Sequence, residues 1–290
     1  MKSPFNWVGN KYKFLPQINS LVAGKSYLSV IDLFMGSGNV ILNLDCQAER
    51  WIGNDRQKLI PSIFQSLVET EAFSITEVDG ILESNQRFSS KESYYAFRDY
   101  WNVRYRSGQF DRKFALETAL LLKMCSNSMV RFNSEGMFNQ GFRGLGTDAE
   151  FFKGTMLRDV VDQLNQIVVL VQSKNFKFTT KDFKQYDDTD RTNRLLILDP
   201  PYALGDKGMY NQEFPRSDGR HLLSLIENTK NDFIYFNYLE HGNQVYTDLQ
   251  DVISRRNFRV IDIGDNNVSA GQGGKIAKHV REVMVTNVQV

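Results

Sequence analysis

The residues DPPY, 199–202, directly follow an apolar run at 195–198 that predicts a buried strand. A carboxylate at the end of such a strand is costly unless another group pairs with it. The two prolines fix their own φ angles, lack an N–H and keep the residues before them extended. We therefore expect the carboxylate of Asp199, the rigid backbone carbonyl of Pro200 and the ring of Tyr202 to lie together at the mouth of a sheet.

A second stretch, DLFMGSGNV at 32–40, has the pattern of a cofactor-binding turn. Gly36 and Gly38 follow a predicted strand, permit positive φ angles and let a ligand approach the backbone closely. A strand, a glycine-rich turn and a helix together hold nucleotide-like cofactors at the carboxyl edge of a sheet. The missing third glycine argues against a dinucleotide, and the missing Gly-Lys-Ser/Thr excludes a P-loop. A purely structural turn is the alternative interpretation.

Two further segments suit the same kind of site. Asp55 ends a second predicted strand about twenty residues after the glycines, where a carboxylate can accept hydrogen bonds from ribose hydroxyls. It also precedes a predicted helix at 56–69, so an N-cap role is an alternative, and both roles can hold at once. Near the N-terminus, Trp7 offers a flat face and Lys11 a cation for a cofactor carboxylate. The alternative there is a packed segment that ends in an exposed lysine.

Short apolar strands that alternate with helical patterns must position these residues. The predicted strands lie at 29–34, 50–54, 176–180, 194–198, 232–238, 258–264 and 282–288, and helical patterns include 56–69 and 218–229. This alternation predicts a mostly parallel α/β sheet with helices on both faces. The last two strands leave no room for a helix between them, so we expect them to pair antiparallel around a glycine-rich loop.

The stretch 71–175 interrupts this alternation between the second and third strands. It is rich in helix formers and aromatic residues, and FALETALLLKM at 114–124 predicts a buried helix. A polar, glycine-rich segment with interleaved aromatic residues follows at 125–146. We interpret 71–175 as an inserted second domain.

Composition excludes several classes of protein. Among 290 residues, 41% are hydrophobic and 24% are charged, and no apolar run approaches the roughly 18 residues that span a bilayer. The first residues lack the apolar core of a secretory signal. Cys46 and Cys125, with three histidines, suggest neither a disulfide framework nor a metal site, so we expect a cytoplasmic protein without a metal. A net charge of +1 argues against a broadly basic nucleic-acid-binding surface, but not against a local basic face.

In their order along the chain, PFNWVGNK, DLFMGSG, the long insertion and DPPY resemble the Dam-type (alpha-class) DNA adenine-N6 methyltransferases. Further similarity lies in FKFTTKDF (176–183), RFNSEGMFNQGF (131–142) and REVMVTN (281–287), so the resemblance extends over essentially the whole chain. It implies a doubly wound, mostly parallel Rossmann-like methyltransferase sheet. It also implies a catalytic S-adenosylmethionine-binding domain over 1–70 and 176–290, and an inserted, mainly helical target-recognition domain over 71–175.

The resemblance implies roles for individual residues. S-adenosylmethionine, which leaves as S-adenosylhomocysteine, would be bound by Trp7, Lys11, Asp32, Phe34, Gly36, Gly38, Asp55, Asp182 and Asp199. Asp199 and the Pro200 carbonyl would each accept a hydrogen bond from N6 of adenine, which makes that nitrogen a better nucleophile toward the sulfonium methyl group. The base would flip out of the duplex and stack on Tyr202. Tyr210, Phe214 and Asn237 are candidates for lining the pocket, with core packing as the alternative.

Double-stranded DNA is the partner that the resemblance implies, for a protein that is monomeric in solution and can bind DNA in more than one copy. The residues expected to contact DNA are Arg131, Phe132, Asn133, Glu135, Met137, Asn139, Arg143, Lys275 and Lys278. Phe132 or Met137 would wedge into the opened base step. Arg98, Arg104 and Arg106 are candidates for phosphate contacts, with a solvated amphipathic helix as the alternative.

Glu135 departs from the family pattern, because GATC-specific members have an arginine before the glycine of this hairpin. An acidic side chain prefers the amino group of cytosine to the acceptors of guanine. Arg143 lies nearby in the sequence and can compensate, so GATC stays the first candidate for the recognition site. Two other functions stay open: methylation of cytosine N4 or of RNA, and DNA binding by a regulator without catalysis. A bacterial or phage-encoded enzyme is the expected source class, acting in a bacterial cytoplasm.

Overall fold

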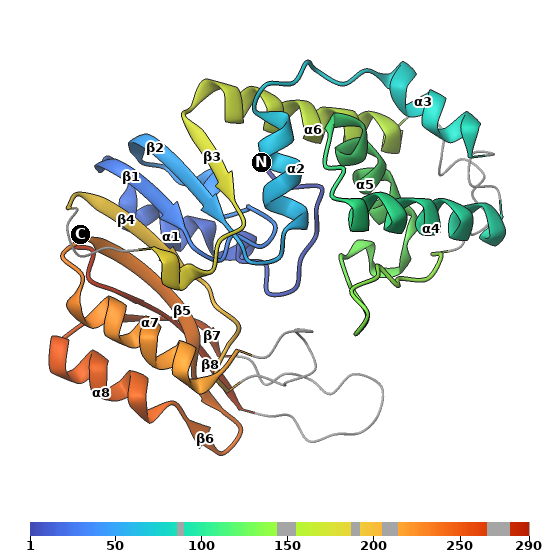
Figure 1. Ribbon diagram of the computed structural model, residues 1–290. Helices are drawn as coiled ribbons and strands as arrows, with labels where there is room; N and C mark the ends of the chain where they lie inside the picture. The colour runs from blue at the N-terminus through green and yellow to red at the C-terminus, as the bar shows by residue number, and fades with distance from the viewer. Residues whose placement is uncertain (86–89, 144–154, 187–191, 205–213, 266–278, 290) are drawn as a thin grey trace. The chain divides into compact units, whose positions relative to one another are not determined.

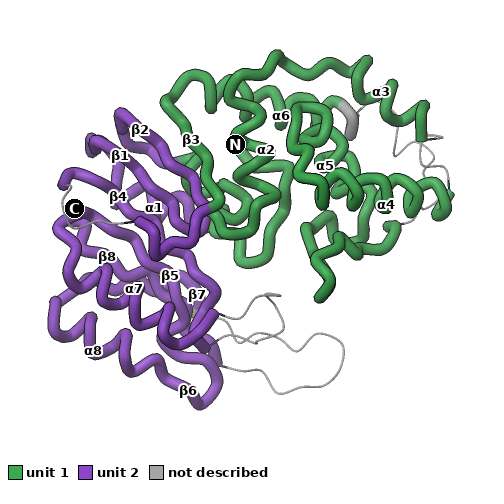
Figure 2. The backbone as a smooth tube through the Cα atoms, viewed as in Figure 1, with its two compact units in different colours: residues 1–13, 35–43, 55–180 green, residues 14–34, 44–54, 181–290 purple. Residues whose placement is uncertain are grey.

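The computed structural model describes residues 1–85, 90–143, 155–186, 192–204, 214–265 and 279–289 (Figure 1). The chain divides into two compact units, each assembled from three stretches of sequence (Figure 2). Unit 1 comprises residues 1–13, 35–43 and 55–180, and unit 2 comprises residues 14–34, 44–54 and 181–290. The division of function between 71–175 and the rest of the chain stays a prediction.

Unit 2 contains a mixed, mostly parallel sheet with the strand order β2-β1-β4-β5-β8-β7. The strands are β1 (Ser26–Asp32), β2 (Gln47–Asn54), β4 (Arg194–Leu198), β5 (Asp232–His241), β7 (Arg259–Asp265) and β8 (Val280–Thr286), and the short β6 (Gln244–Val245) pairs with β5. β8 pairs antiparallel with β5 and with β7, β6 pairs antiparallel with β5, and β2-β1, β1-β4 and β4-β5 pair in parallel. This confirms the predicted fold class and the predicted antiparallel pair.

Register brings the carboxyl ends of the parallel strands to one edge of this sheet. Asp32 lies opposite Gly53 of β2 and Ile197 of β4, and Leu198 of β4 lies opposite Tyr235 of β5. All five residues of β4 are buried, as expected for a central parallel strand covered on both faces. Residues that directly follow β1, β2 and β4 therefore emerge at the edge where α/β proteins bind ligands.

Helices cover both faces of the sheet in unit 2 (Figure 1). α7 (Arg216–Asn228) and α8 (Thr247–Arg256) lie on one face, and α1 (Leu15–Val22) lies on the other. The apolar side chains of α7 and α8 form one cluster with alternate residues of the strands, including Leu222, Val252, Leu198, Phe233 and Val285. Burial of this apolar surface fixes the strands, and with them the polar residues at their ends.

Unit 1 is mainly helical, as the prediction of an inserted helical segment required. It contains α2 (Leu59–Leu67), α3 (Ile75–Ser84), α4 (Lys91–Ser107), α5 (Arg112–Met124), α6 (Thr155–Ser173) and the strand β3 (Phe176–Thr179). Ser74 and Ser90 start α3 and α4 with capping boxes, and Asp111 caps α5 by accepting a 2.8 Å hydrogen bond from the Phe114 amide. Gly108 ends α4 in the left-handed conformation.

An aromatic cluster joins α4 to α5 in unit 1. The Trp101 ring stacks on Tyr105 and on Phe114, at 5.3 and 5.1 Å between centroids, and its Nε1 donates a 2.8 Å hydrogen bond to Thr118. This contact satisfies the one polar group of a fully buried indole. In the part of the chain that the structure describes, no helix is both long and apolar enough to cross a membrane.

Candidate active site

The glycine turn and Asp55 meet in unit 1. The Gly36 amide donates a 2.9 Å hydrogen bond to Oδ2 of Asp55, and the Gln57 amide donates a 2.8 Å hydrogen bond to Oδ1. Gly36 has a φ of +48°, and a Cβ atom at this position would lie 3.3 Å from Cδ1 of Trp7. Lys58, not Asp55, is the N-cap residue of α2, so the helix-capping alternative is wrong. Trp7, Gly36 and Asp55 therefore form one small cluster.

Gly38 and Lys11 also have specific surroundings in unit 1. Gly38 has a φ of +77°, and a Cβ atom there would lie 2.5 Å from Cε2 of Phe64. The helix α2, which contains Phe64, therefore packs directly on the glycine turn. Lys11 is only 4% exposed, and its Nζ donates a 2.7 Å hydrogen bond to the Gly9 carbonyl. The alternative of an exposed terminal lysine is therefore wrong, and the ammonium group is held in place.

In unit 2, Asn54 holds two loops at the carboxyl edge of the sheet. Its Nδ2 donates to the carbonyls of Leu33 (3.1 Å) and Lys181 (3.0 Å), and its Oδ1 accepts from the Lys181 amide at 2.9 Å. The side chain is fully buried. Sequence reasoning missed this residue, although a polar residue that ends an apolar strand was a usable signal. Asn54 fixes the positions of Phe34 and Asp182, which follow the two carbonyls in the chain.

The remaining predicted cofactor residues of unit 2 lie on these loops. Asp32 is 2% exposed and accepts a 3.2 Å hydrogen bond from the Phe34 amide. Asp182 caps the short 3₁₀ helix Phe183–Gln185 by accepting a 3.0 Å bond from the Lys184 amide. Aromatic rings pack around Phe34, which lies 5.2 Å from Phe183 and 6.2 Å from Phe214 between centroids.

The DPPY residues follow β4, where Asp199 is half-buried and Pro200 is buried. Tyr235 of β5 is completely buried, and its hydroxyl accepts a 2.7 Å hydrogen bond from Nδ2 of Asn237. Burial raises the pKa of Tyr235 well above its usual value, and Tyr246 and Asp199 raise it further. The phenol of Tyr235 therefore stays neutral, and the negative charge of Asp199 acts in the same direction as burial.

Tyr202 contacts one acidic and one aromatic side chain in unit 2. Its hydroxyl donates a 2.7 Å hydrogen bond to Oε1 of Glu282, and its ring contacts Tyr238 edge-on at 4.5 Å. Sequence reasoning did not single out Glu282, because β8 reads as an ordinary apolar strand. Tyr210, the other predicted aromatic residue of the pocket, lies outside the described residues.

The predicted hairpin at 131–142 is present in unit 1. Phe132 and Phe138 form an antiparallel bridge, and Gly136 has a φ of +73° at the turn. Oδ1 of Asn133 accepts hydrogen bonds from the amides of Glu135 (3.1 Å) and Met137 (2.9 Å), so this side chain shapes the turn. The exposed side chains of the hairpin and the segment after it include Arg131, Glu135, Asn139 and Arg143.

The hairpin is anchored by packing and by one backbone contact. The Phe132 ring stacks on Tyr105 at 4.9 Å, so it serves to fix the hairpin and leaves Met137 as the candidate wedge. The Val130 amide donates a 3.0 Å hydrogen bond to the Asn6 carbonyl, which ties the hairpin to the segment that carries Trp7. Lys275 and Lys278 lie outside the described residues.

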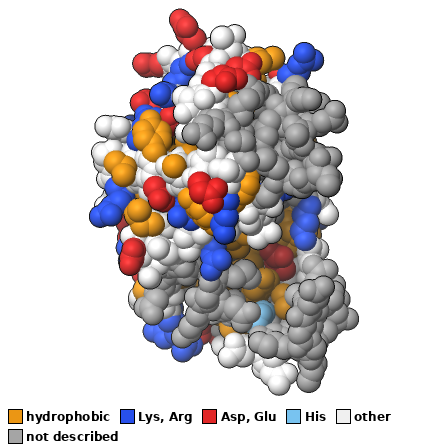
Figure 3. Space-filling view, turned by 90° about the vertical axis from the view of Figure 1, so that its right-hand side faces the viewer, with side chains coloured by type: hydrophobic (Ala, Val, Ile, Leu, Met, Phe, Trp, Pro, Cys, Tyr) orange, Lys and Arg blue, Asp and Glu red, His pale blue; other side chains and the backbone are white. Residues whose placement is uncertain are grey.

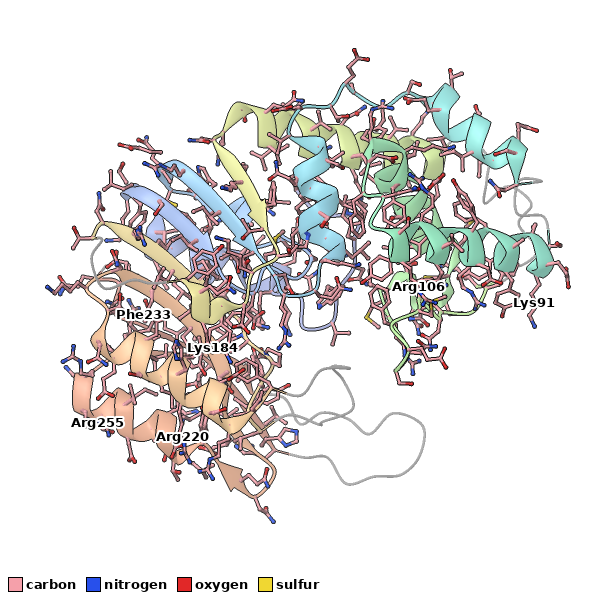
Figure 4. The ribbon with its side chains drawn as sticks, in the orientation of Figure 1. Lys91, Arg106, Lys184, Arg220, Phe233 and Arg255 are labelled. Carbon is pink, nitrogen blue, oxygen red and sulfur yellow. The ribbon has the colours of Figure 1, made fainter. Side chains whose placement is uncertain are left out.

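The candidate phosphate contacts on α4 divide into two kinds. Arg104 is 7% exposed and forms ion pairs with Asp111, at 2.7 Å, and with buried Glu117. It therefore cannot contact phosphate, and that part of the hypothesis is wrong. Arg98 lies over the Tyr95 ring at 4.5 Å, with Lys91 at 5.7 Å from the same ring. Figure 4 shows Lys91 and Arg106 near opposite ends of the helix.

Charge is mixed over the surface that Figure 3 shows, where Lys and Arg side chains are interspersed with acidic ones. This agrees with the near-neutral composition. Among the described residues, no group of three or more His, Cys, Asp or Glu side chains is arranged to hold a metal ion.

Comparison with known proteins gives one family and several relatives. A family model described as D12 class N6 adenine-specific DNA methyltransferase matches residues 7–261. The modification methylase StsI of Streptococcus sanguinis is 26% identical over 301 residues, covering 100% of this chain and 43% of the relative. The type II methyltransferase M.FokI of Planomicrobium okeanokoites is 27% identical, covering 83% and 36%. The DNA N-6-adenine-methyltransferase of Escherichia phage P1 is 25% identical, covering 78% and 28%.

Proposed function

We propose, from the premise that this chain belongs to the D12 class of N6 adenine-specific DNA methyltransferases, that it methylates N6 of adenine in double-stranded DNA with S-adenosylmethionine as donor. The chain spans less than half the length of the relatives it matches, so the complete activity is part of the proposal. The observation that carries it is the Asp199-Pro200 turn directly after buried β4, at the carboxyl edge of the sheet.

The residues present fit the cofactor. A cradle in which Gly36 has no Cβ and faces Trp7, an oriented carboxylate on Asp55 and a buried ammonium on Lys11 match a nucleoside that bears an amino-acid tail. In the proposal, Asp55 accepts from the ribose hydroxyls and Lys11 faces the carboxylate. Asp32, Phe34, Gly38, Asp182 and Asp199 complete the cofactor residues. Bound there, the cofactor supplies a methyl group activated by the positive charge on sulfur.

The chain's own task is to make adenine N6 nucleophilic and to aim it. The exocyclic nitrogen shares its lone pair with the ring, so it attacks poorly in water. Asp199 and the Pro200 carbonyl accept one N6–H each, which favours a tetrahedral nitrogen and stabilises positive charge as the new bond forms. Pro201 prevents the turn from relaxing, because its ring fixes φ. Tyr202 supplies a surface on which the flipped base stacks, holding N6 in line for attack.

The target sequence belongs to the same proposal. Arg131, Glu135, Asn139 and Arg143 are exposed on and just after the hairpin and are the side chains proposed to read base edges. Asn133 is better described as part of the turn, because its side-chain Oδ1 accepts hydrogen bonds from two backbone amides. GATC is the first candidate site, and Glu135 is the residue to which we assign the difference in specificity should methylation occur in another sequence.

Methylation of an unmodified bacterial genome by the purified protein tests this function. Single-molecule sequencing would map every modified base after incubation with S-adenosylmethionine. N6-methyladenine confined to GATC supports both the activity and the site. N6-methyladenine in another sequence supports the activity and assigns the change to the 131–143 hairpin, where Glu135→Arg should move the preference. Methylated cytosine, or no modified base at all, would overturn the proposal.

A further inference from the structure

Glu282 contacts Tyr202 from β8, the antiparallel strand that lies two places from β4 in the sheet. The Tyr202 hydroxyl donates a 2.7 Å hydrogen bond to its Oε1, and Tyr238 contacts the Tyr202 ring edge-on at 4.5 Å with an interplanar angle of 77°. Glu282 belongs to β8 and lies directly opposite Tyr238 of β5. One cross-strand pair therefore holds both the hydroxyl and the ring of the last DPPY residue.

Irregular pairing on both sides of β8 directs Glu282 to this position. The register shifts between Tyr238 and Glu240 on β5, and between Asp262 and Gly264 on β7. Glu282 is the β8 residue paired at both shifts, opposite Tyr238 and Gly264. Bulges of this kind bend a strand and re-aim side chains, and they are frequent next to active sites.

The preceding residue of β8 has entirely different partners. Nε of Arg281 lies 2.6 Å from Asp262, and its Nη1 lies 3.6 Å from Glu240. These two carboxylates on neighbouring strands hold the guanidinium of Arg281. Glu282, one residue later, instead accepts from the phenol that follows the catalytic turn.

We infer that Glu282 is a positioning residue for the target adenine, an inference that rests on the proposed function. By accepting from the Tyr202 hydroxyl, its carboxylate fixes the ring on which the base stacks. The charge-assisted bond also places negative charge beside the hydroxyl of that ring and makes the ring richer in electrons. An electron-rich ring favours a cation over its face.

The electron-rich ring of Tyr202 stabilises the adenine when the base becomes positively charged during methyl transfer. As N6 bonds to the methyl carbon, the electrons of the S–C bond stay with sulfur. The adenine then carries a positive charge until its N6 proton passes to water. Stabilisation that exists only while this charge is present raises kcat rather than affinity. Glu282 therefore affects turnover more than binding.

The test compares Glu282→Gln, Glu282→Ala, Tyr202→Phe and the double variant Tyr202→Phe/Glu282→Gln in the full chain. Loss of a charge-assisted hydrogen bond that acts in the transition state predicts a kcat about ten- to hundredfold lower for the single variants. KM for a DNA duplex should change less than about twofold, since only the ring's charge partner is altered. The double variant should be no slower than Tyr202→Phe, because the two groups act through one bond. Glu227→Gln, which breaks an exposed ion pair with Arg255 on α8, is the matched control.

A duplex with 2-aminopurine at the target position gives a second readout. In the Glu282→Ala complex the base should stack less well and fluoresce more strongly than in the wild-type complex. Wild-type kcat and wild-type fluorescence in Glu282→Ala would overturn the inference, as would effects that multiply in the double variant. Glu282→Gln keeps the shape of the side chain. The comparison of Tyr202→Phe, Glu282→Gln and their double variant therefore tests the inference even if the alanine variant does not fold. An inactive wild-type protein would instead overturn the proposed function and this role with it.

Discussion

The Gly36 amide and the Asp55 carboxylate are joined by a 2.9 Å hydrogen bond, across nineteen positions of sequence. The second carboxylate oxygen is held by the Gln57 amide at 2.8 Å. Two backbone donors therefore orient the carboxylate before any ligand arrives. A group that is already fixed loses little conformational freedom on binding, so it contributes more to affinity.

Asp55→Asn should weaken binding of S-adenosylmethionine. The amide keeps the shape but replaces one acceptor oxygen with a donor, so it cannot satisfy both backbone amides and a ribose hydroxyl. Hydrogen bonds to charged groups contribute about 1.5–3 kcal/mol, which predicts a Kd roughly ten- to hundredfold higher by calorimetric titration. Asp45→Asn, at an exposed position, should leave Kd unchanged. An unchanged Kd in Asp55→Asn would remove Asp55 from the cofactor site.

Gly38→Ala should destabilise the protein through a steric clash. A Cβ atom would lie 2.5 Å from Phe64 in addition to the strain of a φ of +77°. Gly108→Ala is the matched control, because its φ is +74° and nothing lies within 4 Å of the added atom. Backbone strain predicts a cost of about 1–2 kcal/mol in both variants. Overpacking adds about 1–3 kcal/mol at Gly38 alone, measurable by denaturant unfolding. Equal costs would mean that Phe64 moves aside freely.

Sequence periodicity predicts the strands well here because each one is an apolar run that the sheet buries. RLLIL becomes the fully buried β4, and the closing pair β7 and β8 is antiparallel as expected. Site residues are predictable where they stand in a turn next to a strand, as Gly36 and Asp55 do. Glu282 could not be found this way, since its role comes from which strand lies beside it. Asn54 offers a signal as a polar residue that ends an apolar strand, but its bonds to two loops depend on which loops lie beside it. Arg104 shows the opposite error. The sequence suggests an exposed arginine that could contact phosphate, but its guanidinium forms ion pairs with Glu117 and Asp111.

Glu77→Gln should reduce stability at neutral pH and leave it unchanged in strong acid. Hydrogen bonds from Arg112 lower the pKa of Glu77 to about 2, with help from Ser74. The folded-state pKa is lower than the unfolded value of 4.5, so the stabilisation is present above pH 4.5 and disappears as the pH falls toward 2. The side chain is 38% exposed, and solvent screening limits the contribution to about 1 kcal/mol or less.

Thermal unfolding as a function of pH measures this effect. The difference in Tm between wild type and Glu77→Gln should be largest near pH 6 and should vanish near pH 2. Glu69→Gln, at an exposed position after α2, provides the comparison for a carboxylate lost from the surface. A difference in Tm that does not depend on pH would show that Glu77 acts through its capping geometry and not through its charge.

Two substitutions of Asp199 separate the effect of its negative charge from the effect of its hydrogen-bond acceptor. The residue follows buried β4 and acts electrostatically on the fully buried Tyr235. Asparagine keeps an acceptor oxygen for one N6–H but removes the negative charge that faces the developing positive charge. Alanine removes both. Neither change touches the exposed hairpin residues proposed to bind DNA.

Asp199→Asn should therefore lower kcat by about 10²–10³-fold, the effect of removing one group that stabilises charge in a transition state. Asp199→Ala should abolish methyl transfer. Both variants should bind duplex DNA with a Kd within about twofold of wild type in a gel-shift titration, since binding depends mainly on phosphate contacts elsewhere. Asp251→Asn, exposed on α8, controls for a change in net charge. Substantial turnover by Asp199→Ala would exclude activation of N6 by this carboxylate, and a large loss of DNA binding would mean that Asp199 supports the duplex as well.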